Sequence, residues 1–166
     1  MPDRTVFATV GTTQFDALIR TLCSPDVLAA LAAAGYTALR LQVGHGAAPP
    51  EVVDPPLAFE WYRFKPSLAD DMRTAALIIS HAGAGSILEG LRQRATMVVV
   101  VNDSLMHNHQ EELAHEMHSR RHLVATVPSE LLATLRQLPQ LVSTLEPLPE
   151  GDPGAFARFL TAELGL

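Results

Sequence analysis

Short apolar runs alternate with helical segments along most of the chain, and this alternation restricts the folds open to it. The runs typical of strands are residues 5–10 (TVFATV), 38–44 (ALRLQVG), 57–64 (LAFEWYRF), 76–80 (ALIIS), 96–102 (TMVVVVN) and 122–127 (HLVATV). Strands that are apolar on both faces and separated by helices are typical of a parallel sheet with helices on both sides. The sequence therefore predicts an α/β fold with a doubly wound parallel sheet.

The C-terminal part of the chain differs from this pattern. We expect one α/β domain over residues 1–138, a proline-rich connector over 139–153 and a terminal helix over 154–166. A chain of 166 residues is long enough for one such domain with a sizeable core. The terminal helix carries Phe156, Phe159, Leu160 and Leu164 on one face. It could therefore fold back over its own sheet or dock on another chain.

Composition excludes several classes of partner. The net charge of −6, without any basic run, disfavours nucleic acid binding. The single cysteine, Cys23, allows no internal disulfide and suits a reducing compartment. No segment approaches the roughly 18 consecutive apolar residues of a membrane span. We expect a soluble chain with no direct membrane span, which leaves docking on a membrane protein open.

Three loops that follow predicted strands carry candidate binding groups, because ligands of such folds lie beyond the carboxyl ends of the strands. In GTT, glycine permits close backbone approach and the threonines offer hydroxyls. In HAGAGS, the glycines leave the N–H groups at a helix start free to face a diphosphate. In NDSLMHNHQ, amide side chains can both donate to and accept from sugar hydroxyls. The candidates are Gly11, Thr12, Gly83, Ala84, Gly85, Ser86, Asn108 and Gln110, with Glu89 one helical turn after Ser86.

Other interpretations of the same residues remain open or are disfavoured. A glycine-rich turn that binds nothing is as common as one that binds phosphate, and HAGAGS has neither the P-loop lysine nor the dinucleotide spacing. His81 and Ser86 suggest a hydrolase, but Ser86 is not in a G-x-S-x-G turn. The histidines of the segment 107–122 lack zinc-site spacing, so we expect no metal site. We expect three aromatic residues in the core rather than in a stacking platform: Trp61, Tyr62 and Phe64.

Several segments, taken together and in order, resemble a known family along nearly the whole chain. They are FATVGTTQFDALI, WYRFKPSL, ADDMRTAALIISHAGAGSILEGL, MVVVVNDSLMHNHQEELA and HLVAT. This pattern is similar to the small cytosolic subunit of the UDP-N-acetylglucosamine (UDP-GlcNAc) transferase of asparagine-linked glycosylation. It also resembles the C-terminal half of bacterial peptidoglycan GlcNAc transferase, of glycosyltransferase family 28. The resemblance implies a Rossmann-like domain, the donor-binding half of a GT-B fold, over residues 1–138.

The resemblance also implies an activity and a location. The chain would bind UDP-GlcNAc and act with a membrane-anchored partner that binds the acceptor. Together they would transfer GlcNAc, with inversion, to dolichyl-diphosphate-GlcNAc and form dolichyl-diphosphate-chitobiose. The chain would be cytoplasmic and recruited to the cytosolic face of the endoplasmic reticulum.

The family's site residues carry over to matching positions of this sequence. Gly11 and Thr12 would lie near the diphosphate, and residues 83–86 would cradle it. Glu89 would bind the ribose hydroxyls, and the backbone near Phe64 and Lys65 would meet the uracil edge. Asn108 and Gln110 would contact the GlcNAc ring, with His109 between them. His81 stands where the bacterial relative has arginine, so its charge would depend on pH.

The chemistry that the resemblance implies needs no cofactor from this chain. No Asp-x-Asp metal signature accompanies the loops, so hydroxyls and the helix N-terminus would stabilise the leaving UDP. The catalytic base is not identified and could come from the partner. Two alternatives remain open, namely a sugar-nucleotide-binding module without turnover and a module that stabilises a partner subunit.

Overall fold

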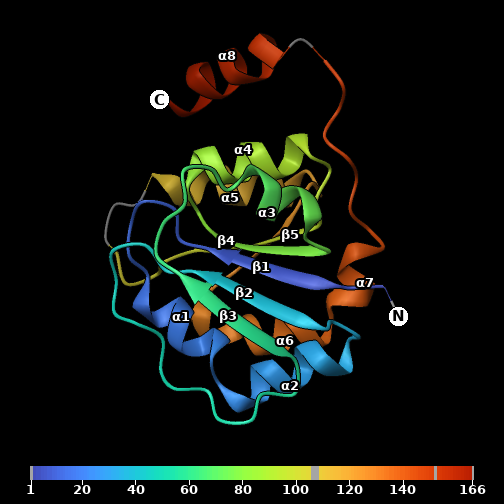
Figure 1. The fold of residues 1–166 in the computed structure, drawn as a ribbon. Helices are drawn as coiled ribbons and strands as arrows, with labels where there is room; N and C mark the ends of the chain where they lie inside the picture. Colours follow the sequence, from blue (N-terminus) through green and yellow to red (C-terminus); the bar gives the residue numbers. More distant parts are fainter. Residues whose placement is uncertain (1, 106–108, 152, 166) are drawn as a thin grey trace.

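A six-stranded parallel sheet forms the centre of the molecule, with the strand order β3-β2-β1-β4-β5-β6 (Figure 1). The computed structural model describes residues 2–105, 109–151 and 153–165. The strands are β1 (Thr5–Thr9), β2 (Ala38–Gln42), β3 (Ala58–Tyr62), β4 (Leu77–His81), β5 (Met97–Val100) and β6 (Val124–Thr126). Five strands lie within a predicted run and β4 extends one residue beyond its run, to His81, so the doubly wound parallel sheet is confirmed.

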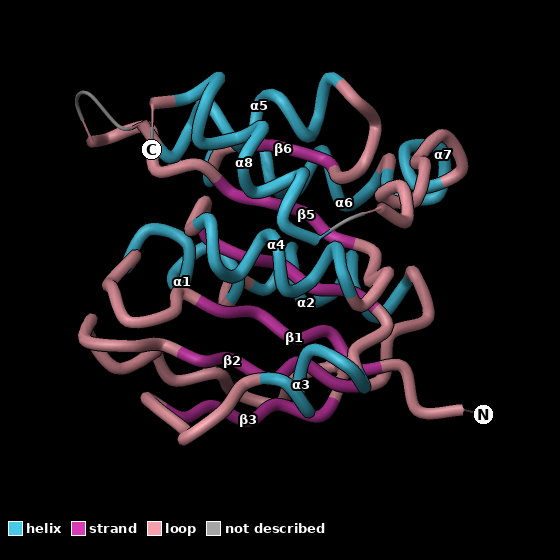
Figure 2. Tube along the Cα trace, turned by 90° about the horizontal axis from the view of Figure 1, so that it is seen from above, coloured by secondary structure: helices cyan, strands magenta, loops and turns pink. Residues whose placement is uncertain are grey.

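Helices cover both faces of this sheet. On one face lie α1 (Asp16–Leu22), α2 (Pro25–Ala33), α6 (Leu131–Arg136) and α7 (Leu138–Val142) (Figure 1). On the other lie α3 (Ala69–Thr74), α4 (Ala84–Arg92), α5 (Gln110–Ser119) and α8 (Pro153–Leu164), which Figure 2 shows in front of the strands. A short 3₁₀ helix, Pro128–Glu130, precedes α6.

The alternation of side chains along β1 explains how one strand serves two cores. Val6 and Ala8 belong to the cluster beneath α1 and α2, whereas Phe7 belongs to the cluster beneath α4 and α5. Successive side chains of a strand point to opposite faces, and here both faces are buried. The continuous apolar sequence of this strand follows from that burial.

The order of the strands reverses beside β1, and this reversal places the candidate loops. β1 pairs in parallel with β2 on one side and with β4 on the other. At the carboxyl edge of the sheet, Thr9 is in register with Gln42 of β2 and Ser80 of β4. In doubly wound sheets the crevice at such a reversal is the usual ligand site.

The edge strand β3 departs from the expectation of a buried run. Trp61 and Phe64 retain 43% and 46% of their surface exposed, so their expected burial in the core is wrong. Tyr62 is half-buried. β3 pairs only with β2, so its outer side lacks a neighbouring strand of the sheet. Its apolar composition therefore does not indicate a strand that is buried on both faces.

The C-terminal segment also differs in detail from expectation. The proline-rich connector, expected over 139–153, begins with helix α7. Further along, α8 contributes the buried Leu160 to the core cluster beneath α4 and α5. The Phe156 side chain lies outside the described part of the structure. Among the helices of the described ranges, none has the length and apolarity needed to span a bilayer.

Candidate functional site

Loops from the carboxyl ends of several strands line an open cleft of about 530 Å³. Its walls come from the loop after β1 and the start of α1, from His45 after β2, and from the loop after β5. A smaller cavity of about 30 Å³ shares part of this wall and is lined also by His81, Ala82 and Gln110. The strand order therefore brings the three predicted loops to one edge.

The His81 imidazole lies between the two glycine-containing loops. A Cβ atom on Gly11 would lie 2.9 Å from His81 Cε1, and one on Gly83 would lie 2.2 Å from His81 Nε2. Gly11 also has a φ of +62°, which disfavours other residues. Two of the glycines that the sequence assigned to a diphosphate are thus also needed to accommodate this ring.

Burial determines the ionisation of His81. The side chain is 8% exposed, and its Nδ1 has no hydrogen-bond partner among the described residues. This burial lowers the pKa of His81 below its ordinary value, and the Thr9 backbone opposes the shift only in part. The imidazole at this position is therefore uncharged near neutral pH.

The first turn of α4 follows His81 and Ala82, which line the smaller cavity. Gly83 is the N-cap residue, and within the described structure no side chain caps this helix. Gly85 is exposed, and a Cβ atom there would meet nothing within 4 Å. Ala84, Ser86 and Glu89 are half-buried along the same helix. Uncapped N–H groups at a helix start, without obstructing side chains, suit an anion such as a diphosphate.

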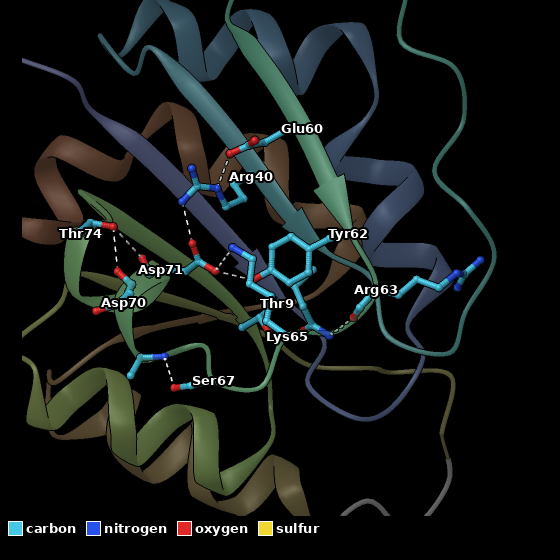
Figure 3. A network of polar contacts seen from close by, with 12 residues as sticks. Thr9, Arg40, Glu60, Tyr62, Arg63, Lys65, Ser67, Asp70, Asp71 and Thr74 are labelled. Atoms are coloured by element: carbon cyan, nitrogen blue, oxygen red, sulfur yellow. Dashed lines mark hydrogen bonds and ion pairs between the residues drawn. The ribbon is translucent and has the colours of Figure 1, made fainter.

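Asp71 organises a polar network behind the segment that follows β3 (Figure 3). Its carboxylate accepts hydrogen bonds from Arg40 Nη1 at 2.6 Å, Tyr62 Oη at 2.5 Å and Lys65 Nζ at 2.9 Å. Arg40 also pairs with Glu60. Burial alone would raise the pKa of Asp71, but these hydrogen bonds outweigh it and lower the pKa. The Asp71 carboxylate is therefore charged at neutral pH.

This network defines the role of the segment 63–65 in the site. The Lys65 ammonium is bound to Asp71 and lies 4.2 Å from the Tyr62 ring centroid. Phe64, in contrast, is exposed, and its ring centroid is 4.7 Å from that of His45. An aromatic ring beside a backbone segment held in place can receive a planar base. The Lys65 side chain is therefore engaged within the chain and holds this segment in place.

The remaining predicted residues occupy different places. Thr12 is exposed in the loop after β1. Gln110 lines the smaller cavity, and His109 is exposed, with its Nδ1 3.7 Å from Glu112 Oε1. Asn108 lies outside the described residues. Of the predicted site residues that the structure describes, His81 and Gln110 line the smaller cavity. The others line neither described cavity, namely Gly11, Thr12, Phe64, Lys65, residues 83–86, Glu89 and His109.

Sequence reasoning missed part of the cleft lining and one buried amide. The missed lining residues are Gln14, Phe15, Asp16, His45, Asn102, Ser104 and Leu105. Their position directly after strands was the available signal, but their residue types alone do not distinguish them from ordinary loop residues. The missed amide is Gln42, whose side chain is 1% exposed at the carboxyl end of β2.

Two histidines of α5 and the turn after it make structural contacts. His118 Nδ1 accepts a hydrogen bond from the Ala125 N–H at 3.1 Å, and His122 Nδ1 lies 2.9 Å from the Glu146 carbonyl oxygen. Over the ranges that the structure describes, no group of three or more His, Cys, Asp or Glu side chains could hold a metal ion.

Comparisons with known proteins agree with this architecture. The model of the glycosyltransferase family 28 C-terminal domain matches residues 5–149. The human UDP-N-acetylglucosamine transferase subunit ALG13 is 48% identical over 119 residues, which are 71% of this chain and 10% of the human protein. The subunit of the same name from Yarrowia lipolytica is 33% identical over 156 residues, 92% of this chain and 80% of that protein. The chain thus spans about a tenth of the human relative's length.

Solved structures show the same fold. An NMR solution structure of ALG13 superposes with a TM-score of 0.73 at 25% identity, covering 99% of this chain and 98% of that one. A crystal structure of Acinetobacter baumannii MurG superposes with a TM-score of 0.64 at 18% identity. That match covers 99% of this chain and 50% of MurG.

Proposed function

The chain belongs to the glycosyltransferase family 28 C-terminal domain family, and on this premise we propose that it is the donor-binding subunit of a UDP-GlcNAc transferase. The match over residues 5–149 carries the proposal, because it includes every candidate loop of the cleft. Relatives named as UDP-N-acetylglucosamine transferase subunits support the choice of donor. The proposed reaction is the second GlcNAc addition to the dolichol-linked acceptor of asparagine-linked glycosylation.

The geometry suggests how the donor is held. The diphosphate faces the first turn of α4, where Gly85 leaves the approach open and Ser86 can donate a hydrogen bond. The uracil lies against the segment of Phe64 and Lys65, and Glu89 accepts hydrogen bonds from the ribose hydroxyls. Gln110 contacts the sugar from the far wall of the cleft.

The reaction develops charge where these groups lie. The bond between the sugar C1 and the UDP oxygen breaks, and a bond from C1 to the acceptor hydroxyl oxygen forms on the opposite face. N–H groups aimed at the β-phosphate stabilise the negative charge that grows on the leaving UDP. The hydroxyl proton passes to a base that we assign to the acceptor-binding partner.

The assembly and location follow from the same premise. Relatives of this chain are named as subunits, which supports a complex with a second polypeptide. We place the acceptor site and membrane anchor on that partner, and the complex on the cytosolic face of the endoplasmic reticulum. On this proposal the isolated chain binds the donor but does not turn it over.

Calorimetric titration with UDP-GlcNAc tests the donor assignment. We expect saturable binding that UDP competes for and that GDP-mannose does not. Glu89→Ala should weaken it, while Glu163→Ala on the exposed side of α8 serves as the matched loss of a carboxylate. Absence of UDP-GlcNAc binding would refute the donor assignment. Transfer to the lipid acceptor by the purified chain alone would refute the division between subunits.

A further inference from the structure

The Gln42 side chain is a buried amide whose hydrogen-bonding groups are all used. It lies at the end of β2, in register with Thr9 of β1 and Tyr62 of β3. Its Oε1 accepts hydrogen bonds from Thr9 Oγ1 at 2.5 Å and from the Gly11 N–H at 2.9 Å. Its Nε2 donates to the Gly11 carbonyl at 2.8 Å and to the Arg63 carbonyl at 2.7 Å.

These contacts hold Gly11 at both of its backbone polar groups. Gly11 is in the left-handed region, with a φ of +62°, and begins the loop proposed to lie near the diphosphate. The same N–H also lies 3.1 Å from Thr9 Oγ1. The amide therefore fixes the direction in which this loop leaves the sheet.

The fourth contact reaches a different subsite. Arg63 begins the segment that continues to Phe64 and Lys65, where we place the uracil. The Arg63 guanidinium also donates to the carbonyls of Gly44 and Gly46, at 3.1 and 2.6 Å. The Gln42 amide thus connects the loop after β1 with the segment after β3, across the strand that lies between them.

A third segment is connected through van der Waals contact. The space beside Gly11 is filled by the His81 ring, and the same ring borders Gly83 at the start of α4. A shift of the Gly11 backbone would therefore press on His81 and the first turn of α4. Close-packed interiors transmit such shifts because they have no voids to absorb them.

We propose that Gln42 is a positioning residue that fixes the distance between the uracil-binding and the diphosphate-binding segments of the donor site. The inference rests on the proposed function and adds a residue that does not itself touch the donor. Only asparagine and glutamine carry both a two-hydrogen donor and an acceptor oxygen, and asparagine is one methylene shorter. Glutamate lacks the donors to Gly11 and Arg63, and methionine lacks all four hydrogen bonds.

The test compares variants of Gln42 with a control that destabilises the sheet elsewhere. Gln42→Glu and Gln42→Met are prepared in the full chain, with Val98→Ala, a fully buried residue of β5, as the control. Affinities for UDP and UMP are measured by calorimetry at a temperature where denaturation curves show each variant fully folded. Under that condition, lower global stability does not lower the apparent affinity, because nearly all molecules are binding-competent.

We expect the Gln42 variants to bind UDP about tenfold to hundredfold more weakly than the wild type, as for a site that has lost preorganisation. The affinity for UMP should fall less, because UMP lacks the β-phosphate and depends less on the spacing of the two segments. Val98→Ala should bind both nucleotides as the wild type does. In the assembled complex, the variants that bind UDP more weakly should show the higher KM for UDP-GlcNAc.

A second pair of variants tests the proposal if substitutions at Gln42 prevent folding. Thr9→Val removes the hydroxyl that donates to Gln42 Oε1, while Thr9→Ser retains it. We expect weaker UDP binding from the valine variant alone.

Other results would overturn the inference. Wild-type affinity for UDP in the Gln42 variants would overturn it. A loss of UDP affinity in Val98→Ala as large as that in the Gln42 variants would also overturn it, and so would a loss of UMP affinity as large as the loss of UDP affinity in the Gln42 variants. Equal affinity in the two Thr9 variants would do the same. Absence of UDP binding by the wild type would instead refute the proposed function itself.

Discussion

Single glycines of the HAGAGS loop have different physical roles, although the sequence makes them look alike. Gly83 is buried, and the space where its Cβ would lie is occupied by His81 Nε2, at 2.2 Å. Gly85 is exposed, and its Cβ would point into open space. A side chain at position 83 would therefore clash with the protein itself. A side chain at position 85 would clash only with a bound ligand.

Alanine substitutions separate these two roles. Gly83→Ala should lower the free energy of unfolding by about 1–3 kcal/mol, as other overpacked interiors do. Gly85→Ala should change it by no more than about 1 kcal/mol, because alanine favours the helix. Chemical denaturation measures both free energies of unfolding, and titration with UDP measures the affinity of each folded variant.

For Gly85→Ala we expect UDP affinity to fall about tenfold, because the methyl group enters the approach to the helix N-terminus. Unchanged UDP affinity in this folded variant would place the diphosphate elsewhere.

The Asp71 carboxylate makes the stability of the chain depend on pH. Asp71→Asn should destabilise the chain by about 1.5–3 kcal/mol at pH 7, the usual value for hydrogen bonds to a charged group. The pKa of Asp71 is lowered from its ordinary 3.8, so its contribution is present above that pH and is lost as pH falls through the lower folded-state value. Denaturation curves of wild type and variant should therefore converge below about pH 4. If the difference in free energy of unfolding between wild type and variant stayed constant down to pH 2, the charge of the Asp71 carboxylate would not be the source of this stability.

In helix α4, a glycine makes room for the Met97 side chain of β5. A Cβ atom at Gly90 would lie 2.4 Å from the sulfur of Met97, which is fully buried. The glycine therefore sets the spacing between this helix and the sheet. The first turn of the same helix carries the candidate diphosphate site, so its seating on the sheet also positions that site.

Gly90→Ala should lower the free energy of unfolding by about 1–3 kcal/mol, because Met97 must move within a filled core. The double variant Gly90→Ala with Met97→Leu should behave non-additively, since the two side chains meet. Additive losses in urea denaturation would show that the contact is not the cause.

The elements themselves could be predicted well from the sequence, because β1, β4 and β5 are buried on both faces and their apolar runs are continuous. β3 could not be distinguished from them, because Trp61 and Phe64 are apolar whether they line a core or a rim. The glycine-rich and amide-rich loops marked the edge of the sheet where the cleft lies. Gln42 gave no such signal, since its role depends on partners brought together from β1 and β3.

The C-terminal segment crosses back over the domain. Arg94 and Arg121, at the ends of α4 and α5, pair with Glu150 and Glu146 of the connector. The Glu146 N–H also donates to the Arg121 carbonyl at 2.7 Å. Beyond the connector, Leu160 is 4% exposed in α8, and the Arg120 guanidinium lies 5.0 Å from the Phe159 ring centroid. Leu160 is thus the main apolar anchor among the described side chains of this helix.

Leu160→Ala should lower the free energy of unfolding by about 2–4 kcal/mol if α8 is seated this way in solution. Glu163→Ala, on the same helix but exposed, should change it by less than about 0.5 kcal/mol. Thermal or chemical denaturation of the isolated chain gives both values. Equal stabilities would mean that α8 is undocked in the absence of a second polypeptide.

The central place of β1 has a consequence for biosynthesis. The strand is made early, yet one of its two hydrogen-bonding partners, β4, begins only at Leu77. While the ribosome adds the intervening residues, β1 can pair with β2 and still presents an open backbone edge on its other side. The nascent chain therefore passes through an interval in which this apolar strand can recruit a foreign one, and that interval closes only when β4 has emerged from the exit tunnel.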